Sequence, residues 1–195
     1  MCDFFGVSVV PFDLGWNMTL ADMNSSMHGQ RVQHYLPYSM PADYQSMPFG
    51  EFLEEHILRY EGQPYSYDHR MLATMSYPTE DIFGELTSDF ECEYRDFFVG
   101  ARGSGVNFHE HLAIDHYLLS GSKMWFFVED YSVIADVLGP MEAIGPKVET
   151  LKSWPGVSVC MLEAGEMMHV PKNVIHGVFN LETSISAGCL EYNYK

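Results

Sequence analysis

The feature that most constrains the fold is a succession of short apolar segments with tight turns between them. Strand-like segments are expected over residues 107–119, 123–129, 157–163, 166–170, 174–180 and 184–191. Glycine and proline stand in several of the intervening turns, where they favour the backbone conformations of a tight reversal. Closely spaced short strands are typical of a β-sandwich or barrel. A chain of 195 residues with 47% hydrophobic residues is long and apolar enough for one domain with its own core.

The first half of the chain has one clear helical pattern. Apolar residues in the segment 48–60 recur at intervals of three and four, which puts them on one face of a helix. A strand is expected over residues 31–36, and a short helix capped by Asp130 over residues 131–138. Residues 1–30 are weakly patterned and are interpreted as an arm that packs on the core or is partly mobile.

The balance of charged side chains limits the partners. The chain has 27 acidic and 10 basic residues, which gives a formal charge of −17. A field of this sign repels nucleic acid backbones and anionic membrane surfaces, so neither is expected as a partner. This charge is compatible with a basic peptide or protein substrate. The simpler alternative is that it only keeps the protein soluble.

The cysteines and the N-terminal residues bear on the cellular compartment. Cys2, Cys92, Cys160 and Cys189 form no CxxC pair and have no zinc-knuckle spacing. We expect them to be reduced, as is usual inside cells. Asp3 stands where a secretory signal carries positive charge, and no apolar run is long enough for a transmembrane span. The sequence therefore predicts an intracellular protein, cytoplasmic or nuclear.

Three histidines form the strongest candidate for a functional site. His109 and His111 lie two residues apart at the start of a predicted strand, so both point to one face, and Glu110 points to the other. His176 follows a strand, a proline-containing turn and a return strand, whereas its rival His169 precedes that turn. Because imidazole binds iron, copper, nickel and zinc, we predict a metal site made of His109, His111 and His176. The simpler alternative is that these histidines only satisfy hydrogen bonds in a polar pocket.

Further motifs accompany the histidines in a fixed order. The run 98–109 looks like the strand and turn that lead into an HxD/E motif, and the run 121–127 looks like a GxKxW strand. The run 165–176 looks like a G(D/E)-x-x-x-x-P-x-x-x-x-H turn, and residues 49–53 look like a pre-barrel helix. In this order and spacing they resemble the JmjC family of cupin-fold oxygenases, over about residues 46–190.

The resemblance implies a fold and a domain organisation. The implied fold is mainly β with a few helices, the cupin-type double-stranded β-helix or jelly-roll barrel, with the site inside its mouth. Residues 1–195 would form a single JmjC-like domain. Residues 1–45 would be the N-terminal lead-in, and residues 46–195 the barrel with its pre-barrel helix.

The resemblance also implies reactants and a pocket. Fe(II) would be held by the three histidines, with 2-oxoglutarate as small-molecule co-substrate and O₂ as oxidant. Lys123 would pair with the distal carboxylate of 2-oxoglutarate, although an ordinary exposed turn lysine is the alternative. Asp115 and Tyr117, together with His116, are candidate pocket residues by position. Trp125 is interpreted as barrel packing.

The chain departs from the family pattern at two positions. His111 stands where the family has Asp or Glu, which makes the site more positive by one charge. Zinc, copper and nickel then become alternatives to Fe(II). Val106 stands three residues before His109, where many relatives carry a hydroxyl that helps to bind the co-substrate.

Three functions are compatible with this sequence. The first is an Fe(II)/2-oxoglutarate-dependent dioxygenase that hydroxylates a protein or a small molecule. The second is a three-histidine cupin dioxygenase that binds its substrate directly to the metal. The third is a non-catalytic cupin that serves as a metal-binding or interaction module. A fold by itself does not decide among them.

Overall fold

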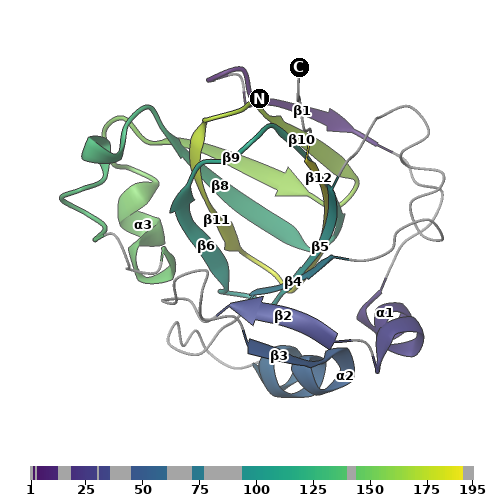
Figure 1. The fold of residues 1–195 in the computed structure, drawn as a ribbon. Coiled ribbons are helices and arrows are strands. Elements are labelled where there is room, and N and C mark those ends of the chain that lie inside the picture. Colours follow the sequence, from purple (N-terminus) through teal and green to yellow (C-terminus); the bar gives the residue numbers. More distant parts are fainter. Residues whose placement is uncertain are drawn as a thin grey trace.

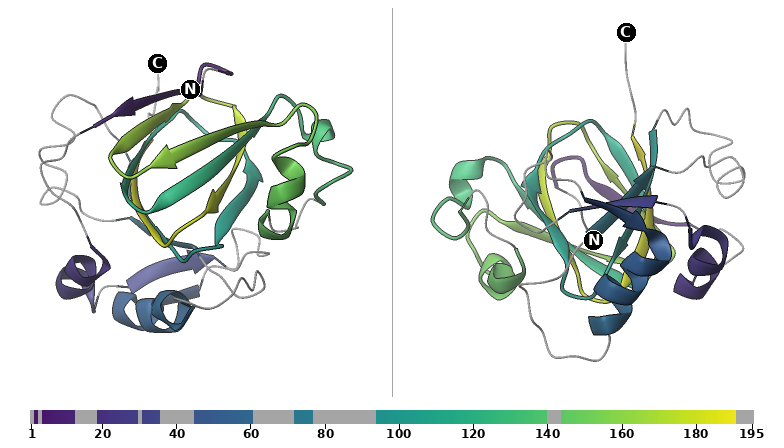
Figure 2. Two further views of the ribbon diagram at one scale, coloured as in Figure 1. Left: turned by 180° about the vertical axis from the view of Figure 1, so that it is seen from behind. Right: turned by 60° about the horizontal axis from the view of Figure 1, so that its bottom comes forward.

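The protein is mainly β, with two antiparallel sheets that face each other and a few short helices (Figures 1 and 2). The computed structural model describes residues 2, 4–12, 19–29, 31–35, 45–60, 72–76, 94–139 and 144–190. Over these ranges, every helix is too short or too polar to cross a bilayer.

The larger sheet has eight strands in the order β1-β10-β7-β12-β5-β4-β2-β3. Its strands are β1 (Ser8–Pro11), β2 (Arg31–Tyr35), β3 (Gln45–Pro48), β4 (Leu72–Ser76), β5 (Tyr94–Gly100), β7 (Ile114–Ser120), β10 (Glu166–Val170) and β12 (Ser184–Leu190). Strand β1 brings the N-terminal segment to one edge, where it pairs with β10. The segment 1–30 therefore contributes a strand to the sheet.

The smaller sheet has four strands in the order β6-β11-β8-β9. Its strands are β6 (Gly105–His109), β8 (Ser122–Val128), β9 (Ser158–Glu163) and β11 (Ile175–Asn180). Every residue of β8 and β11 is buried, because both faces of this sheet are covered. The two sheets curve around a common interior, which gives the molecule the form of a barrel (Figure 1).

Side-chain alternation sorts the core into an inner cluster and two outer clusters. Along β8, Trp125 and Phe127 join the inner cluster, which is built from strands of both sheets. Met124 and Phe126 point the other way, into the cluster with α3 (Val148–Leu151). Along β12, Ile185 joins the cluster between the larger sheet and α2. The odd-numbered residues of β8 therefore face the barrel interior.

The helical pattern predicted for residues 48–60 is confirmed. Helix α2 (Phe49–Phe52) continues without a break through a π-helical segment (Leu53–Ile57) and a 3₁₀ turn (Leu58–Tyr60). Its buried residues form the predicted apolar face: Phe49, Phe52, Leu53 and Ile57. Helix α1 (Leu20–Met27) lies in the weakly patterned segment 1–30, and it begins with a capping box between Thr19 and Asp22.

Two predicted elements differ from the structure. The strand expected over residues 107–119 is two strands, because the chain leaves the smaller sheet after β6 and enters the larger sheet at β7. The helix expected over residues 131–138 is reduced to one 3₁₀ turn (Tyr131–Val133). The predicted cap is present, since Asp130 Oδ1 accepts a hydrogen bond from the backbone N–H of Ser132 at 2.8 Å.

The expectation of reduced cysteines is wrong. Cys2 and Cys160 form a disulfide across 158 residues of sequence, and Cys189 is also disulfide-bonded. Spacing along the chain gave no sign of the first pair, because Cys2 reaches β9 only when the N-terminal segment folds back beside β10. Cys2 and Phe4 then pack on the inner cluster, and the Phe4 ring lies 5.3 Å from that of Phe127.

Candidate metal centre

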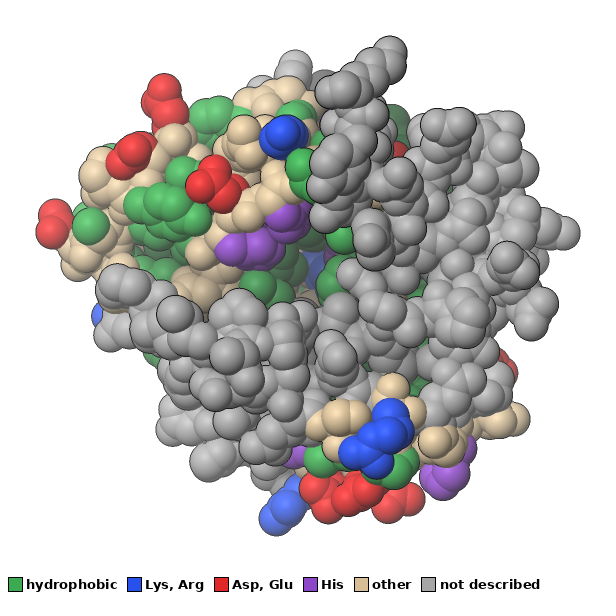
Figure 3. Space-filling view, viewed as in Figure 1, with side chains coloured by type: hydrophobic (Ala, Val, Ile, Leu, Met, Phe, Trp, Pro, Cys, Tyr) green, Lys and Arg blue, Asp and Glu red, His purple; other side chains and the backbone are tan. Residues whose placement is uncertain are grey.

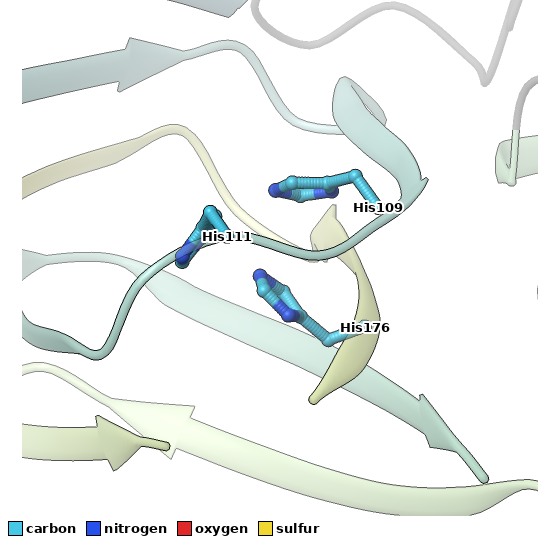
Figure 4. Close-up of side chains that lie close together, drawn as sticks. All are labelled: His109, His111 and His176. Atoms are coloured by element: carbon cyan, nitrogen blue, oxygen red, sulfur yellow. The ribbon is translucent and has the colours of Figure 1, made fainter. Parts of the chain in front are cut away.

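The structure brings His109, His111 and His176 together. His109 ends β6 and lies directly opposite His176 on β11, while His111 lies in the segment that crosses between the sheets. The ring centroids are 4.4 Å apart for His109 and His176, 4.7 Å for His111 and His176, and 5.2 Å for His109 and His111. The three rings point toward one another (Figure 4), and each offers a ligand nitrogen within 4.8 Å of the others.

Hydrogen bonds orient all three rings in the same way. The Nδ1 atoms of His109, His111 and His176 lie 2.7, 2.5 and 2.8 Å from the backbone carbonyl oxygens of Asn107, Leu112 and Val174. A carbonyl oxygen only accepts, so each Nδ1 carries the proton and donates it. Each Nε2 therefore keeps its lone pair for the centre of the cluster, which is the arrangement usual for metal-binding histidines.

Electrostatics also keep the rings in the form that binds metal. Burial lowers the pKa of His109 from 6.5 to about 4, and the nearby His111 adds to this effect. Burial and the neighbouring His109 hold the pKa of His176 well below 6.5. Both imidazoles are thus neutral at pH 7. Three imidazole nitrogen donors fit iron, copper, nickel or zinc, and within the described ranges this cluster contains no carboxylate.

The turn between β10 and β11 holds two parts of the site together. Asn173, whose φ of 62° lies in the left-handed region, donates its backbone N–H to the carbonyl oxygen of His111 at 2.9 Å. Three residues later the chain reaches His176. The turn brings His176 next to His109 and His111, as the sequence predicts. Glu110, between His109 and His111, is exposed to solvent.

Lys123 is an interior residue and not a turn lysine. It lies on β8 two residues from Trp125 and is 2% exposed. Burial lowers the pKa of its ammonium group to about 7. In the part of the chain that the structure describes, no carboxylate pairs with it. Histidine side chains line a hollow on this face of the molecule (Figure 3).

Asp115 and Tyr117 are not brought to the histidines. The carboxylate of Asp115 lies 2.7 Å from Nδ1 of His169 on β10, the residue that rivalled His176 as a ligand. The Tyr117 ring packs in the cluster outside the larger sheet, 5.3 Å from the ring of Phe12. Neighbours on a strand point to opposite faces, so Asp115 and Tyr117 lie on one face of β7 and His116 lies on the other. His116, between these two residues, faces inward and contacts Trp125.

Sequence reasoning missed most of the polar lining deeper in the barrel. Three buried side-chain atoms have no hydrogen-bond partner in the described structure: His116 Nε2, Trp125 Nε1 and Ser186 Oγ. A signal for Ser186 is visible in β12, where small residues alternate with apolar ones in the order Ser184, Ile185, Ser186, Ala187, Gly188. For Trp125, the sequence pattern indicates only packing.

Comparisons with known proteins agree with this architecture. No family model matches the chain. The chain is 29% identical over 126 residues to an arginine-specific demethylase, JMJ22 of Arabidopsis thaliana, which covers 56% of this chain and 25% of that protein. Two solved structures of YcfD, a ribosomal oxygenase from Escherichia coli, superpose with TM-scores of 0.53 and 0.54 at 16% and 13% identity. One of them is a complex with cobalt and succinic acid.

The comparisons differ in what they support. Both YcfD superpositions cover 97% of this chain and 48% of the other, and they confirm the mainly β, cupin-type fold. Together with the sequence similarity to the demethylase, they support a JmjC-like family. The chain spans a quarter of the length of the demethylase and about half that of YcfD.

Proposed function

We propose that this protein is a metal-dependent JmjC-like oxygenase that uses Fe(II) and 2-oxoglutarate to hydroxylate a protein or a small molecule. The observation that carries the proposal is the cluster of His109, His111 and His176, with each Nδ1 donating to a backbone carbonyl and each Nε2 left for a metal. The resemblance to a demethylase and to a ribosomal oxygenase supports this class of reaction.

Each residue then has a definite task. The three histidines would hold the metal through their Nε2 atoms, and the bound metal would supply the binding of co-substrate and O₂. Bound iron and 2-oxoglutarate supply the oxidation, in which one atom of O₂ enters the substrate and the other enters succinate as carbon dioxide leaves. The ammonium group of Lys123 pairs with the distal carboxylate of 2-oxoglutarate, and that negative charge raises the depressed pKa of Lys123 again. Trp125 and Phe127, both buried, keep water out of the interior.

A basic protein segment is the substrate that we favour. The formal charge of −17 attracts cationic partners and steers them to the surface. The demethylase that resembles this chain is described as arginine-specific, and YcfD as a ribosomal oxygenase. A small-molecule substrate is the alternative within the same proposal.

One observation favours a second candidate function. His111 stands in place of the carboxylate of the usual triad, and a site of three imidazoles suits a cupin dioxygenase that binds its substrate directly to the metal. In that case O₂ uptake would not require 2-oxoglutarate. A non-catalytic module would retain metal and show no turnover at all.

Oxygen consumption by protein loaded separately with Fe(II), Zn²⁺, Cu²⁺ or Ni²⁺ separates these functions. The proposal expects uptake only with Fe(II) and 2-oxoglutarate together, with succinate as product. Uptake without 2-oxoglutarate would establish the second candidate, and metal retention without any uptake would establish the module. His111→Asp adds a further comparison, because higher 2-oxoglutarate turnover in this variant would identify a modified oxygenase triad.

Metal binding itself is tested with a matched pair of histidines. His176→Ala removes a ligand and should weaken metal binding by more than about 100-fold, since changes outside the ligand shell alone cost about 10–100-fold. His169→Ala should retain the metal, because His169 bonds to Asp115 on the outer side of the sheet. Equal metal retention by both variants, measured by elemental analysis of untagged protein, would refute the ligand assignment.

A further inference from the structure

Strand β6 has one residue more than the matching part of β11, and the irregularity lies directly before His109. His109 on β6 lies opposite His176 on β11. Three residues before His109, Val106 lies opposite Val178, which is only two residues from His176. An extra residue in one strand of a pair is a β-bulge, which bends the strand and often re-aims a side chain beside a site. The bulge occupies the two residues between Val106 and His109.

This bulge affects the direction in which the His109 side chain points. In a regular strand, residues three apart point to opposite faces. Val106 lies opposite Val178, a residue of the inner cluster, and directly opposed residues share a face. His109 nevertheless faces the same interior, where its ring centroid lies 4.4 Å from that of His176 (Figure 4). The extra residue therefore lets both Val106 and His109 point inward.

Two hydrogen bonds of Asn107 hold the bulge. The side-chain Oδ1 of Asn107 accepts the backbone N–H of Phe108 at 2.8 Å. The backbone carbonyl oxygen of Asn107 accepts the Nδ1–H of His109 at 2.7 Å. Backbone groups that a bulge removes from the ladder need partners of another kind. Asn107 thus supplies a partner to the bulged backbone and also sets the orientation of the His109 ring.

Packing fills the outer side of the bulge. Phe108 contacts the cluster that includes α3. A Cβ atom on Gly177 would lie 3.3 Å from the Phe108 ring and 2.3 Å from Cδ1 of Ile144. A side chain at residue 177 therefore has no room, and the Phe108 ring lies close against β11 next to His176. Side-chain packing on one side and the hydrogen bonds of Asn107 on the other fix the shape of the bulge.

We propose that Asn107 is a positioning residue of the metal centre, which acts through His109 by holding the bulge of β6. This inference rests on the metal site of the proposed function and adds to it a residue that is not itself a ligand. Loss of the Asn107 side chain leaves all three histidines in the chain. It frees the bulged backbone, and the carbonyl oxygen that holds Nδ1 of His109 then loses its fixed place.

Point substitutions of Asn107 separate positioning from stability. Asn107→Ala removes the side-chain acceptor of the Phe108 N–H. We expect Co²⁺ binding to weaken by about tenfold, the lower end of the range for changes outside the ligand shell. The visible absorption of bound Co²⁺ should change as well, because it depends on the geometry of the ligands. Asn107→Asp keeps an acceptor oxygen at the same place and should restore both the affinity and the spectrum.

Deletion of Asn107 tests the bulge itself. Without this residue, equal numbers of residues in β6 and β11 would separate the two pairs, so Val106 and His109 would still point inward from a regular strand. The fold should survive, with Tm close to that of wild-type protein. The carbonyl oxygen that holds the His109 ring would be lost, however, and Co²⁺ binding should weaken by about 10–100-fold.

Asn180→Ala is the matched control, a buried asparagine whose side chain bonds to Ser104 and Ser184 and not to the bulge. Its loss should lower Tm and change the affinity for Co²⁺ by less than about twofold, because its hydrogen bonds lie within the fold. Titration of the metal-free full chain with Co²⁺, followed by visible absorption, provides the affinities and spectra. Thermal unfolding of the same samples provides Tm.

Two results would overturn the positioning role of Asn107. One is a lower Tm in Asn107→Ala with the Co²⁺ affinity and spectrum of wild-type protein, which a purely structural residue would give. The other is an Asn107→Asp variant that folds and binds Co²⁺ as weakly as Asn107→Ala, since the acceptor oxygen would then not matter.

The outcomes also separate this inference from the proposed function. If Fe(II) and 2-oxoglutarate support oxygen uptake while every Asn107 variant binds Co²⁺ as wild-type protein does, the positioning role is wrong and the function stands. If the variants weaken Co²⁺ binding as expected but oxygen uptake never requires 2-oxoglutarate, the positioning role stands and the function is wrong. Wild-type protein that binds no Co²⁺ would overturn both.

Discussion

Two groups of polar side chains are buried in the barrel, and they differ in whether the fold itself pairs them. In the first group, Ser104 Oγ donates to the carbonyl oxygen of Ala101 at 2.7 Å, and Asn180 Nδ2 donates to Ser104 Oγ at 2.8 Å. Ser184 Oγ then donates to Asn180 Oδ1 at 2.9 Å. This network joins the β5–β6 turn to the β11–β12 turn and gives each side chain a partner.

The second group consists of His116, Trp125 and Ser186, each with an unpartnered buried atom among the described residues. Leaving a buried polar atom unpaired costs about 1–3 kcal/mol, so this group lowers the stability of the ligand-free fold. The paired network stabilises the turns of the barrel. The unpaired group does not stabilise the fold in this way, and the two groups should therefore respond differently to substitution.

The largest expected difference is in the pH dependence of the metal-free protein. Burial lowers the pKa of His109 from 6.5 to about 4, and those of His116 and His176 well below 6.5. Below pH 6.5 these histidines become protonated in the unfolded chain but stay neutral in the folded chain. The stability that comes from keeping these rings neutral is therefore fully present above pH 6.5, and the free energy of unfolding falls steadily as the pH drops from 6.5 toward 4.

Denaturant unfolding at a series of pH values measures this slope. His116→Phe, which removes one of the neutral rings, should show a shallower fall between pH 6.5 and 4 than wild-type protein. The paired network contains no group that titrates in this range, so Ser184→Ala should keep the wild-type slope. Identical slopes for wild-type protein and His116→Phe would contradict the assignment of His116 as a buried neutral ring.

The next largest effect is expected from Asn180→Ala. This substitution removes the hydrogen bonds to Ser104 and Ser184 and leaves two buried hydroxyls short of a partner. It should lower the free energy of unfolding by about 3 kcal/mol. Urea denaturation measures the loss, with Ser186→Ala as the comparison that should show none. Equal losses in the two variants would remove the distinction between the paired and unpaired groups.

A smaller effect is expected from Asp115→Ala, outside the barrel interior. The lost hydrogen bond to His169 is partly open to solvent, because the His169 side chain is 34% exposed. The free energy of unfolding should fall by about 1 kcal/mol. Metal and 2-oxoglutarate affinities, measured by calorimetry, should stay within about twofold of wild type because Asp115 faces away from the histidines. A clear loss of co-substrate binding would show that Asp115 contributes to the pocket.

The smallest effect is expected from Tyr117→Phe. The Tyr117 ring packs outside the larger sheet, and burial together with the nearby Asp115 raises the pKa of its hydroxyl to about 12. Removal of the hydroxyl keeps the packing, so stability should change by less than about 0.5 kcal/mol. Co-substrate affinity should not change. Weaker 2-oxoglutarate binding in this variant would show that the outer face of β7 communicates with the site.

Local patterns in the sequence determined much of the fold and the histidine cluster. Alternation put His109 and His111 on one face, and the proline-containing turn before His176 predicted its return to that pair. Strand β10 has the bounds expected from the sequence, and the helical face of residues 48–60 is buried as expected. These features depend on residues close together in the chain, where the periods of strand and helix apply directly.

Only the tertiary structure decided which faces became the interior. Alternation shows that Asp115 and Tyr117 share a face and that His116 has the other, but the pairing of β7 with β10 and β12 determines which face lies inside. The unpaired atoms of His116, Trp125 and Ser186 come from three strands in two sheets, and Cys2 meets Cys160 across 158 residues. Such contacts depend on strand order and closure of the barrel, which no local period encodes.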